Sequence, residues 1–391
     1  MTGRAGFRIG LGEATGAVAD LGILVPLAAA LILTNGLDAG AVFLWAGLLY
    51  LVAGLWFEVP FPVQPLKALT AVAVAEHLAP EVVHAAGIEL GALLLALSLA
   101  RGADRLARWF TKPVVRALQV GVGMLLVVSA WKLIRKPPAI SAAVPSRGVT
   151  TGLAIAVFLV VALAVRSKRY WIVLVALTAG IVGTVTAASP DLSAPALTLP
   201  ELSFPSSHAF AQAFWLLVVP QFPLTFGNAV VAVNALAHEE FGERARRVSP
   251  SRICITDGLA NVAAGALGGM PMCHGSGGLT AHVRLGARTA GMNLLLGGSL
   301  ALAGLLFADD IPTILGVIPV WVLAAFLGYS GVRHAWLAAD LRGFALGVAV
   351  ATGLIGAYAG NLAITAAAAL LLAHGVTLVA RYRRPAGTLA G

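Results

Sequence analysis

Two irregular stretches interrupt an otherwise strongly apolar sequence: Glu58-Val-Pro-Phe-Pro-Val-Gln-Pro65 and Gly268-Gly-Met-Pro-Met-Cys-His-Gly-Ser-Gly-Gly278. Prolines at 60, 62 and 65 lack the amide hydrogen that a helix interior requires, so the first stretch cannot be a regular helix. Each stretch leads into an apolar run, and we expect both segments to be extended first and helical afterwards. Broken backbone at membrane depth is tolerated where protein or a water-filled cavity satisfies its polar groups.

The composition indicates that lipid surrounds this chain. Its 391 residues are 59% hydrophobic and 11% charged, with a mean hydropathy of +0.91. A water-soluble globule would be about a quarter charged, because its surface faces water. We therefore expect an all-α polytopic membrane protein. About fourteen apolar runs are long enough to span the bilayer, at residues 10–32, 39–57, 62–80, 85–100, 113–132, 149–166, 170–187, 208–229, 255–269, 271–288, 291–308, 311–329, 341–358 and 361–380.

The basic residues indicate the orientation of these spans. With the N-terminus inside, most of the 26 Lys and Arg residues fall in predicted cytoplasmic segments, as the positive-inside rule requires. The exceptions are Lys67, inside a span, and a group in one predicted external loop, Lys132, Arg135, Lys136 and Arg147. Both termini are then cytoplasmic, and the protein is expected in the cell membrane, inner or plasma. This distribution also argues against nucleic acid as a partner, despite the net charge of +9.

A proline-rich stretch at residues 188–207 divides the chain into two halves. Residues 1–187 and 208–391 each hold seven predicted spans, with 188–207 as an external linker. An odd number of spans reverses the orientation of the second half, which defines an inverted repeat. The two irregular stretches open spans three and ten, the third span of each half. Paired interruptions of this kind indicate a transporter's substrate site near the membrane midplane.

The two helix starts, near Pro65 and His274, should therefore meet in the middle of the membrane. Free N–H groups and the helix dipole make each start a site for an anion. Lys67 lies two positions after Pro65. A buried ammonium of this kind is expected either to attract an anion or to form a structural ion pair, with Asp20 or Glu13 as the partner.

Side chains and backbone groups near these starts form the candidate substrate-binding set: Gln64, Pro65, Lys67, Gln221, Thr225, Asn228, Cys273, His274, Gly275, Ser276 and Gly277. Each has a structural alternative: helix capping for Gln64, close helix packing for the glycines, and interhelical hydrogen bonds for the residues of span eight. In that span, prolines at 220 and 223 should loosen the helix.

Four intramembrane acids are candidates for proton coupling, because a buried carboxylate can titrate near neutrality: Asp20, Glu58, Glu76 and Asp257. A structural role is the alternative for each. The sequence contains no P-loop motif and no metal-ligand spacing around its two cysteines. We expect no enzymatic activity, no cofactor and no bound metal.

Several motifs resemble those of a known family. Pro62-Val-Gln-Pro-Leu-Lys67-Ala and Pro271-Met-Cys-His-Gly-Ser-Gly-Gly-Leu-Thr280 together resemble the paired signatures of the molybdate transporter family, a branch related to the sulfate permeases. The stretches 12–22 and 223–229 are similar to that family's first and eighth spans. Sulfate permeases add a soluble C-terminal regulatory domain, which we do not expect here because few residues follow position 380.

The resemblance implies the seven-plus-seven inverted repeat of uracil and sulfate permeases. A core domain would comprise spans 1–4 and 8–11, and a gate domain spans 5–7 and 12–14. Related carriers form homodimers, and for this chain a homodimer rests on that analogy alone.

The expected function is therefore secondary active transport of a tetrahedral oxyanion, molybdate, by alternating access. Protons are the expected coupling ion, by symport. A sulfate or other anion permease, or a nucleobase permease, of the same fold is the alternative substrate assignment. An anion channel or a nontransporting membrane scaffold is the alternative of another class.

Overall fold

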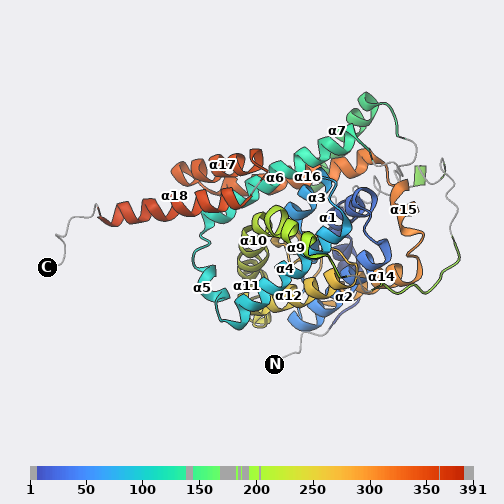
Figure 1. The fold of residues 1–391 in the computed structure, drawn as a ribbon, viewed down its shortest axis with the longest axis horizontal. Helices are drawn as coiled ribbons and strands as arrows, with labels where there is room; N and C mark the ends of the chain where they lie inside the picture. The colour runs from blue at the N-terminus through green and yellow to red at the C-terminus, as the bar shows by residue number, and fades with distance from the viewer. Residues whose placement is uncertain are drawn as a thin grey trace.

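The structure is a computed structural model that describes residues 7–137, 144–167, 182–183, 186, 193–201, 204–360 and 362–382 (Figure 1). For residues 18–22, 165, 330 and 374–382 it describes the backbone alone. Predicted span seven, residues 170–187, falls almost entirely outside these ranges.

The described chain is helical apart from two short strands and its connections. The elements, in order, are α1 (Leu11–Asn35), α2 (Ala39–Phe57), β1 (Gln64–Pro65), α3 (Lys67–Ala75), α4 (Pro80–Leu99), α5 (Ala103–Ala107), α6 (Lys112–Arg135), α7 (Arg147–Arg166), α9 (Ser207–Ala213), η1 (Phe214–Val218), α10 (Val219–Leu224), η2 (Thr225–Ala232), α11 (Val233–Phe241), η3 (Gly242–Ala245), α12 (Pro250–Ala266), β2 (Met272–Cys273), α13 (Ser276–Arg284), α14 (Gly291–Leu306), α15 (Ile311–Val317), α16 (Val320–Trp336), η4 (Leu337–Asp340), α17 (Gly343–Tyr358) and α18 (Leu362–Tyr382).

Several of these helices are long and apolar enough to cross a membrane. By length and composition they are Ala39–Phe57, Pro80–Leu99, Lys112–Arg135, Arg147–Ala164 and Ser207–Ala245. Helices α14 and α15 form a further apolar pair, bent by 115° at the break between them. The prediction of a helical, polytopic membrane protein is thus confirmed.

The helices form two groups (Figure 1). Helices α2, α4, α12 and α14 pack as the pairs α2–α14 and α4–α12, while α6 packs against α16 and α17. Glycines allow the close approach of these pairs. A Cβ on Gly297 would lie 2.8 Å from the Gly47 carbonyl oxygen, and one on Gly91 would lie 2.7 Å from that of Gly258. The buried apolar side chains between these helices form one core.

The predicted change from extended chain to helix is present at both irregular stretches. Strands β1 and β2 pair antiparallel, with Gln64 opposite Cys273 and Pro65 opposite Met272. Helix α3 begins at Lys67 and α13 at Ser276, directly after their strands. The two irregular stretches, far apart in the sequence, are therefore side by side in the structure, and the two helices begin next to each other.

Span eight lies within one long helical element, Ser207–Ala245, which is longer than the predicted 208–229. Its helix α10 contains both prolines, and the π-helical turns η1 and η2 flank it. Proline has no amide hydrogen to donate within the helix, and the π-helical turns accommodate the resulting change in backbone hydrogen bonding. The expected loosening of this helix is confirmed.

The predicted span over residues 311–329 is divided between two helices. The chain breaks between α15 and α16 at Ile318 and Pro319, and α16 then continues to Trp336. Pro319 lacks the amide hydrogen needed to continue α15 and precedes α16 as its N-cap instead. In the linker, the amides of Ala196 and Thr198 donate to Leu306 and Leu305 at the end of α14, 3.0 and 2.9 Å away.

Candidate functional site

The starts of α3 and α13 lie beside each other around the β1–β2 pair. The amide of Leu66 donates to the Pro271 carbonyl across 3.1 Å, which extends the pairing to the residue before α3. The first N–H groups of a helix have no carbonyl partner within it, and its N-terminus carries about half a positive charge. The expectation that the two helix starts meet is therefore confirmed, and the place has the polarity of an anion site.

Lys67 brings a charged side chain to this place. It is 2% exposed, and its Nζ donates to Gln64 Oε1 across 2.6 Å. Gly275 lies directly against both groups, because a Cβ there would collide with Gln64 Oε1 and lie 3.2 Å from Lys67 Nζ. Glycine at 275 thus leaves room for the ends of the Gln64 and Lys67 side chains beside the backbone before α13.

Glu13, one of the two predicted ion-pair partners of Lys67, binds backbone amides. Glu13 Oε1 accepts hydrogen bonds from the backbone amides of Arg288 and Thr289, at 3.1 and 3.0 Å. The other alternative partner, Asp20, lies within α1 in the part described by its backbone alone.

Ser276, the first residue of α13, contacts span eight. Its Oγ donates to Asn228 Oδ1 across 2.7 Å, so two predicted residues are brought together. Gln119 of α6, which sequence analysis did not select, donates to the same oxygen through Nε2 across 3.1 Å. An isolated amide in the apolar run of α6, three residues after Arg116, was the signal that could have identified it.

Gln221 and Thr225 face the start of α3. Gln221 Oε1 accepts from the amide of Leu69, 2.8 Å away, and its Nε2 donates to Thr225 Oγ1 across 2.8 Å. Leu69 is the third residue of α3, so Gln221 satisfies one of the amides that a helix start leaves free. These two residues therefore adjoin the site while serving as a cap from a neighbouring span.

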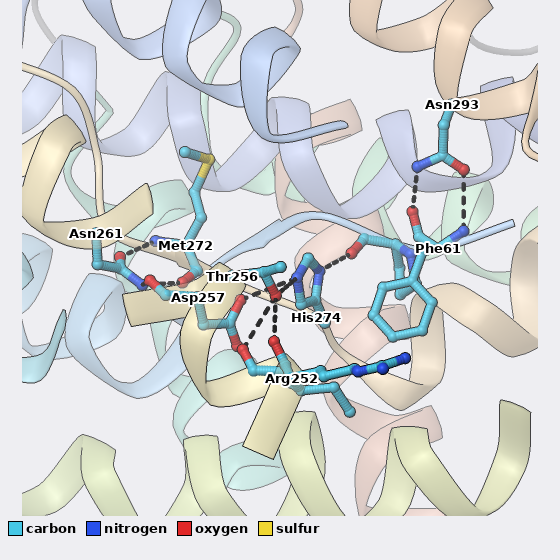
Figure 2. A network of polar contacts seen from close by, with 10 residues as sticks. Phe61, Arg252, Thr256, Asp257, Asn261, Met272, His274 and Asn293 are labelled. Carbon is cyan, nitrogen blue, oxygen red and sulfur yellow. Dashed lines mark hydrogen bonds and ion pairs between the residues drawn. The ribbon is translucent and has the colours of Figure 1, made fainter. Parts of the chain in front are cut away.

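His274 belongs to a second polar group, shown in Figure 2. Its Nδ1 donates to the Pro62 carbonyl across 2.8 Å, and its Nε2 lies 3.1 Å from Thr256 Oγ1 and 3.3 Å from Asp257 Oδ1. The imidazole and the Asp257 carboxylate are both fully buried. The ring also packs edge-on against Phe61, with centroids 4.7 Å apart. His274 thus ties β2 to α12.

Two buried asparagines hold the extended backbone on either side of this group (Figure 2). Asn261 exchanges two 2.7 Å hydrogen bonds with the backbone of Met272. Asn293 accepts from the Phe61 amide at 2.9 Å and donates to the Phe61 carbonyl at 2.7 Å. Backbone groups that no helix can satisfy are therefore paired by side chains, as membrane burial requires.

The remaining predicted residues lie in different surroundings. Pro65 and Cys273 are buried in the strand pair, and Gly277 lies in the first turn of α13. Glu58 ends α2 with a φ of 57° and forms a 3.2 Å ion pair with Arg247, both side chains being partly exposed. Glu76 is exposed at the end of α3. Of the coupling candidates with described side chains, Asp257 is the fully buried one.

The described fold is that of solved transporter membrane domains. The transmembrane domain of the cyanobacterium bicarbonate transporter BicA gives a TM-score of 0.66 at 18% identity, covering 91% of this chain and 96% of that chain. The overall structure of SLC26A9 gives 0.64 at 14% identity, covering 95% and 65%. These likenesses define the class, a helical membrane protein with the BicA and SLC26 fold.

The sequence comparisons define the family. Residues 12–126 and 213–333 match the family described as "Molybdate transporter of MFS superfamily". Molybdate transporter 1 of Arabidopsis thaliana is 31% identical over 374 residues, covering 86% of this chain and 81% of the relative. Molybdate transporter 2 of the same plant is 29% identical, covering 84% and 79%. The chain belongs to the molybdate transporter family, which confirms the resemblance predicted from its motifs.

Proposed function

We propose that this protein is a secondary active transporter of molybdate that holds the anion between the starts of α3 and α13. The buried ammonium of Lys67 beside Gly275 is the observation that carries this proposal. A charged group is costly to bury at membrane depth, and an oxyanion offers an ammonium both opposite charge and hydrogen-bond acceptors. Family membership and the names of the relatives support the substrate.

We also propose the inverted repeat, with seven spans in each half and the predicted core and gate domains. Helix packing supports it: exchanging the halves turns the α2–α14 contact into α12–α4, and the α7–α16 contact into α17–α6. Alternating access would follow from movement of spans 1–4 and 8–11 against the remaining spans. The N-terminus inside, the cell membrane location and the homodimer remain part of this proposal.

Proton symport is the proposed energy source. Moving charge against a negative-inside potential costs about 2.3 kcal/mol per elementary charge per 100 mV, so a dianion does not accumulate passively. Among the predicted acids, Asp257 is the best candidate for the coupling group. It is fully buried 3.3 Å from His274, whose backbone forms part of the segment leading into α13. A proton held there would lie close to the proposed anion site.

Binding to the purified protein tests the substrate. Molybdate, tungstate, sulfate and uracil are compared by thermal shift and by isothermal titration calorimetry in detergent. We expect molybdate to stabilise the protein and to bind more tightly than sulfate. Stronger binding of sulfate or uracil would show that the substrate is that compound and not molybdate. Saturable uptake of molybdate into proteoliposomes then separates a transporter from a channel, which carries current without saturation, and from a scaffold, which carries none.

A further inference from the structure

The polar cluster at the start of α13 includes a side chain from α6. Gln119 is fully buried, and its Nε2 donates to Asn228 Oδ1, which also accepts from Ser276 Oγ. Two donors from two separate helices, α6 and α13, thus converge on one oxygen carried by η2. An amide oxygen accepts two hydrogen bonds through its two lone pairs, and the same pair of donors suits an oxygen of an oxyanion.

The orientation of the Gln119 amide is fixed by Arg116. Arg116 Nη1 donates to Gln119 Oε1 across 2.8 Å, and a guanidinium has no acceptor. The amide oxygen therefore faces Arg116, and the NH₂ group faces Asn228. Arg116 is itself held by Asp340, which accepts from its Nε at 3.0 Å and its Nη2 at 2.6 Å.

We propose that Gln119 is an anion-binding residue contributed by α6, and that the Asn228 amide oxygen holds the place of one substrate oxygen. This inference rests on the proposed transport of molybdate. When the anion binds, Asn228 turns away, and the Gln119 amide and the Ser276 hydroxyl donate to the anion. Both hydrogen bonds strengthen, because the new acceptor carries formal charge.

The position of Gln119 gives this contact a second consequence. Helix α6 is span five, in the proposed gate, whereas η2 and α13 belong to spans eight and ten, in the proposed core. The Gln119–Asn228 hydrogen bond therefore joins the two proposed domains at the site. A substrate bound by both Gln119 and Ser276 would contact both domains. Movement of the core past the gate would then separate the substrate from Gln119 or from Ser276.

The test compares four variants of the full-length protein by calorimetric titration with sodium molybdate, with Lys67→Gln as the reference for loss of binding. Gln119→Leu removes both polar groups at similar volume, and Gln119→Glu keeps a partner for Arg116 but replaces the inward donor by an acceptor. We expect roughly tenfold or greater weakening for Leu, the loss of one hydrogen bond to a charged group, and greater weakening for Glu. Ser129→Ala, on the same helix with a bond to the Leu125 carbonyl, should bind like wild type.

Thermal unfolding without molybdate shows whether each variant is folded. Gln119→Glu keeps a partner for Arg116, so we expect it to fold more readily than Gln119→Leu. Wild-type affinity in both folded Gln119 variants, alongside clear weakening in Lys67→Gln, would overturn the role of Gln119 while leaving molybdate binding intact. Absence of molybdate binding in the wild type would instead overturn the proposed function. Equal weakening in Ser129→Ala would also overturn the inference, since it would trace the effect to packing of α6.

Discussion

Replacing Lys67 by glutamine tests the charge at the centre of the proposed site. The Lys67 side chain is 2% exposed, so water screens it little. Two unit charges 4 Å apart interact by about 4 kcal/mol at the effective dielectric constant of about 20 that suits protein sites. Glutamine retains a hydrogen-bond donor, and the loss of charge relieves some burial cost. We therefore expect a net loss of about 2–3 kcal/mol, roughly 30- to 150-fold in molybdate affinity.

The assay is calorimetric titration of the purified variant with molybdate, with thermal unfolding of the unliganded protein as a check on folding. Lys132→Gln is the matched control, because Lys132 is an exposed lysine near the end of α6 and its replacement changes the net charge equally. Its affinity should stay within about twofold of wild type, as expected for an exposed charge. Wild-type affinity in a folded Lys67→Gln protein would refute the reasoning and make Lys67 a structural residue.

Three further outcomes follow from the described contacts. Asp257→Asn should retain molybdate binding but lose the stimulation of proteoliposome uptake by an acidic exterior, and retained stimulation would remove Asp257 as the coupling group. Asn293→Ala should lower the free energy of unfolding by about 1–3 kcal/mol, because it leaves the Phe61 amide and carbonyl buried without partners; an unchanged melting temperature would contradict this. The hydrogen bond from Arg116 holds the pKa of the Asp340 carboxyl well below its usual range, so the stability that Asp340 contributes should be present at neutral pH and be lost as pH falls below about 4. Asp340→Asn should abolish that part of the acid dependence, and an identical pH profile would show that the pair is not stabilising.

Much of the site could be predicted because proline, glycine and charge have direct physical consequences in a membrane. The prolines of 58–65 predicted an extended segment, the following apolar run predicted a helix, and its start was predicted near Pro65, two residues before the observed start at Lys67. The same reasoning located Ser276 and Gly275 in the second half. Helix boundaries were less accurate: one span was predicted where Pro319 separates α15 from α16.

Side-chain partners across the structure could not be predicted. Gln221 and Asn228 lie seven positions apart on one element, yet one caps α3 and the other meets Ser276. His274 was expected near the anion, and its polar contacts with Pro62, Thr256 and Asp257 were not foreseen. These contacts depend on the rotation and tilt of packed helices, which apolar patterning leaves open when lipid and core are equally hydrophobic.

The sequence by itself determined that lipid surrounds the chain, that the fold is helical, where the two helices are broken and which family the motifs resemble. These follow from composition and from the backbone chemistry of single residues. Only the tertiary structure decided that Gln64 lies opposite Cys273, that Gly275 touches Lys67 and that Gln119 of α6 donates to Asn228. Those contacts join residues up to about two hundred positions apart, and their geometry is set by the packing of the whole helix bundle.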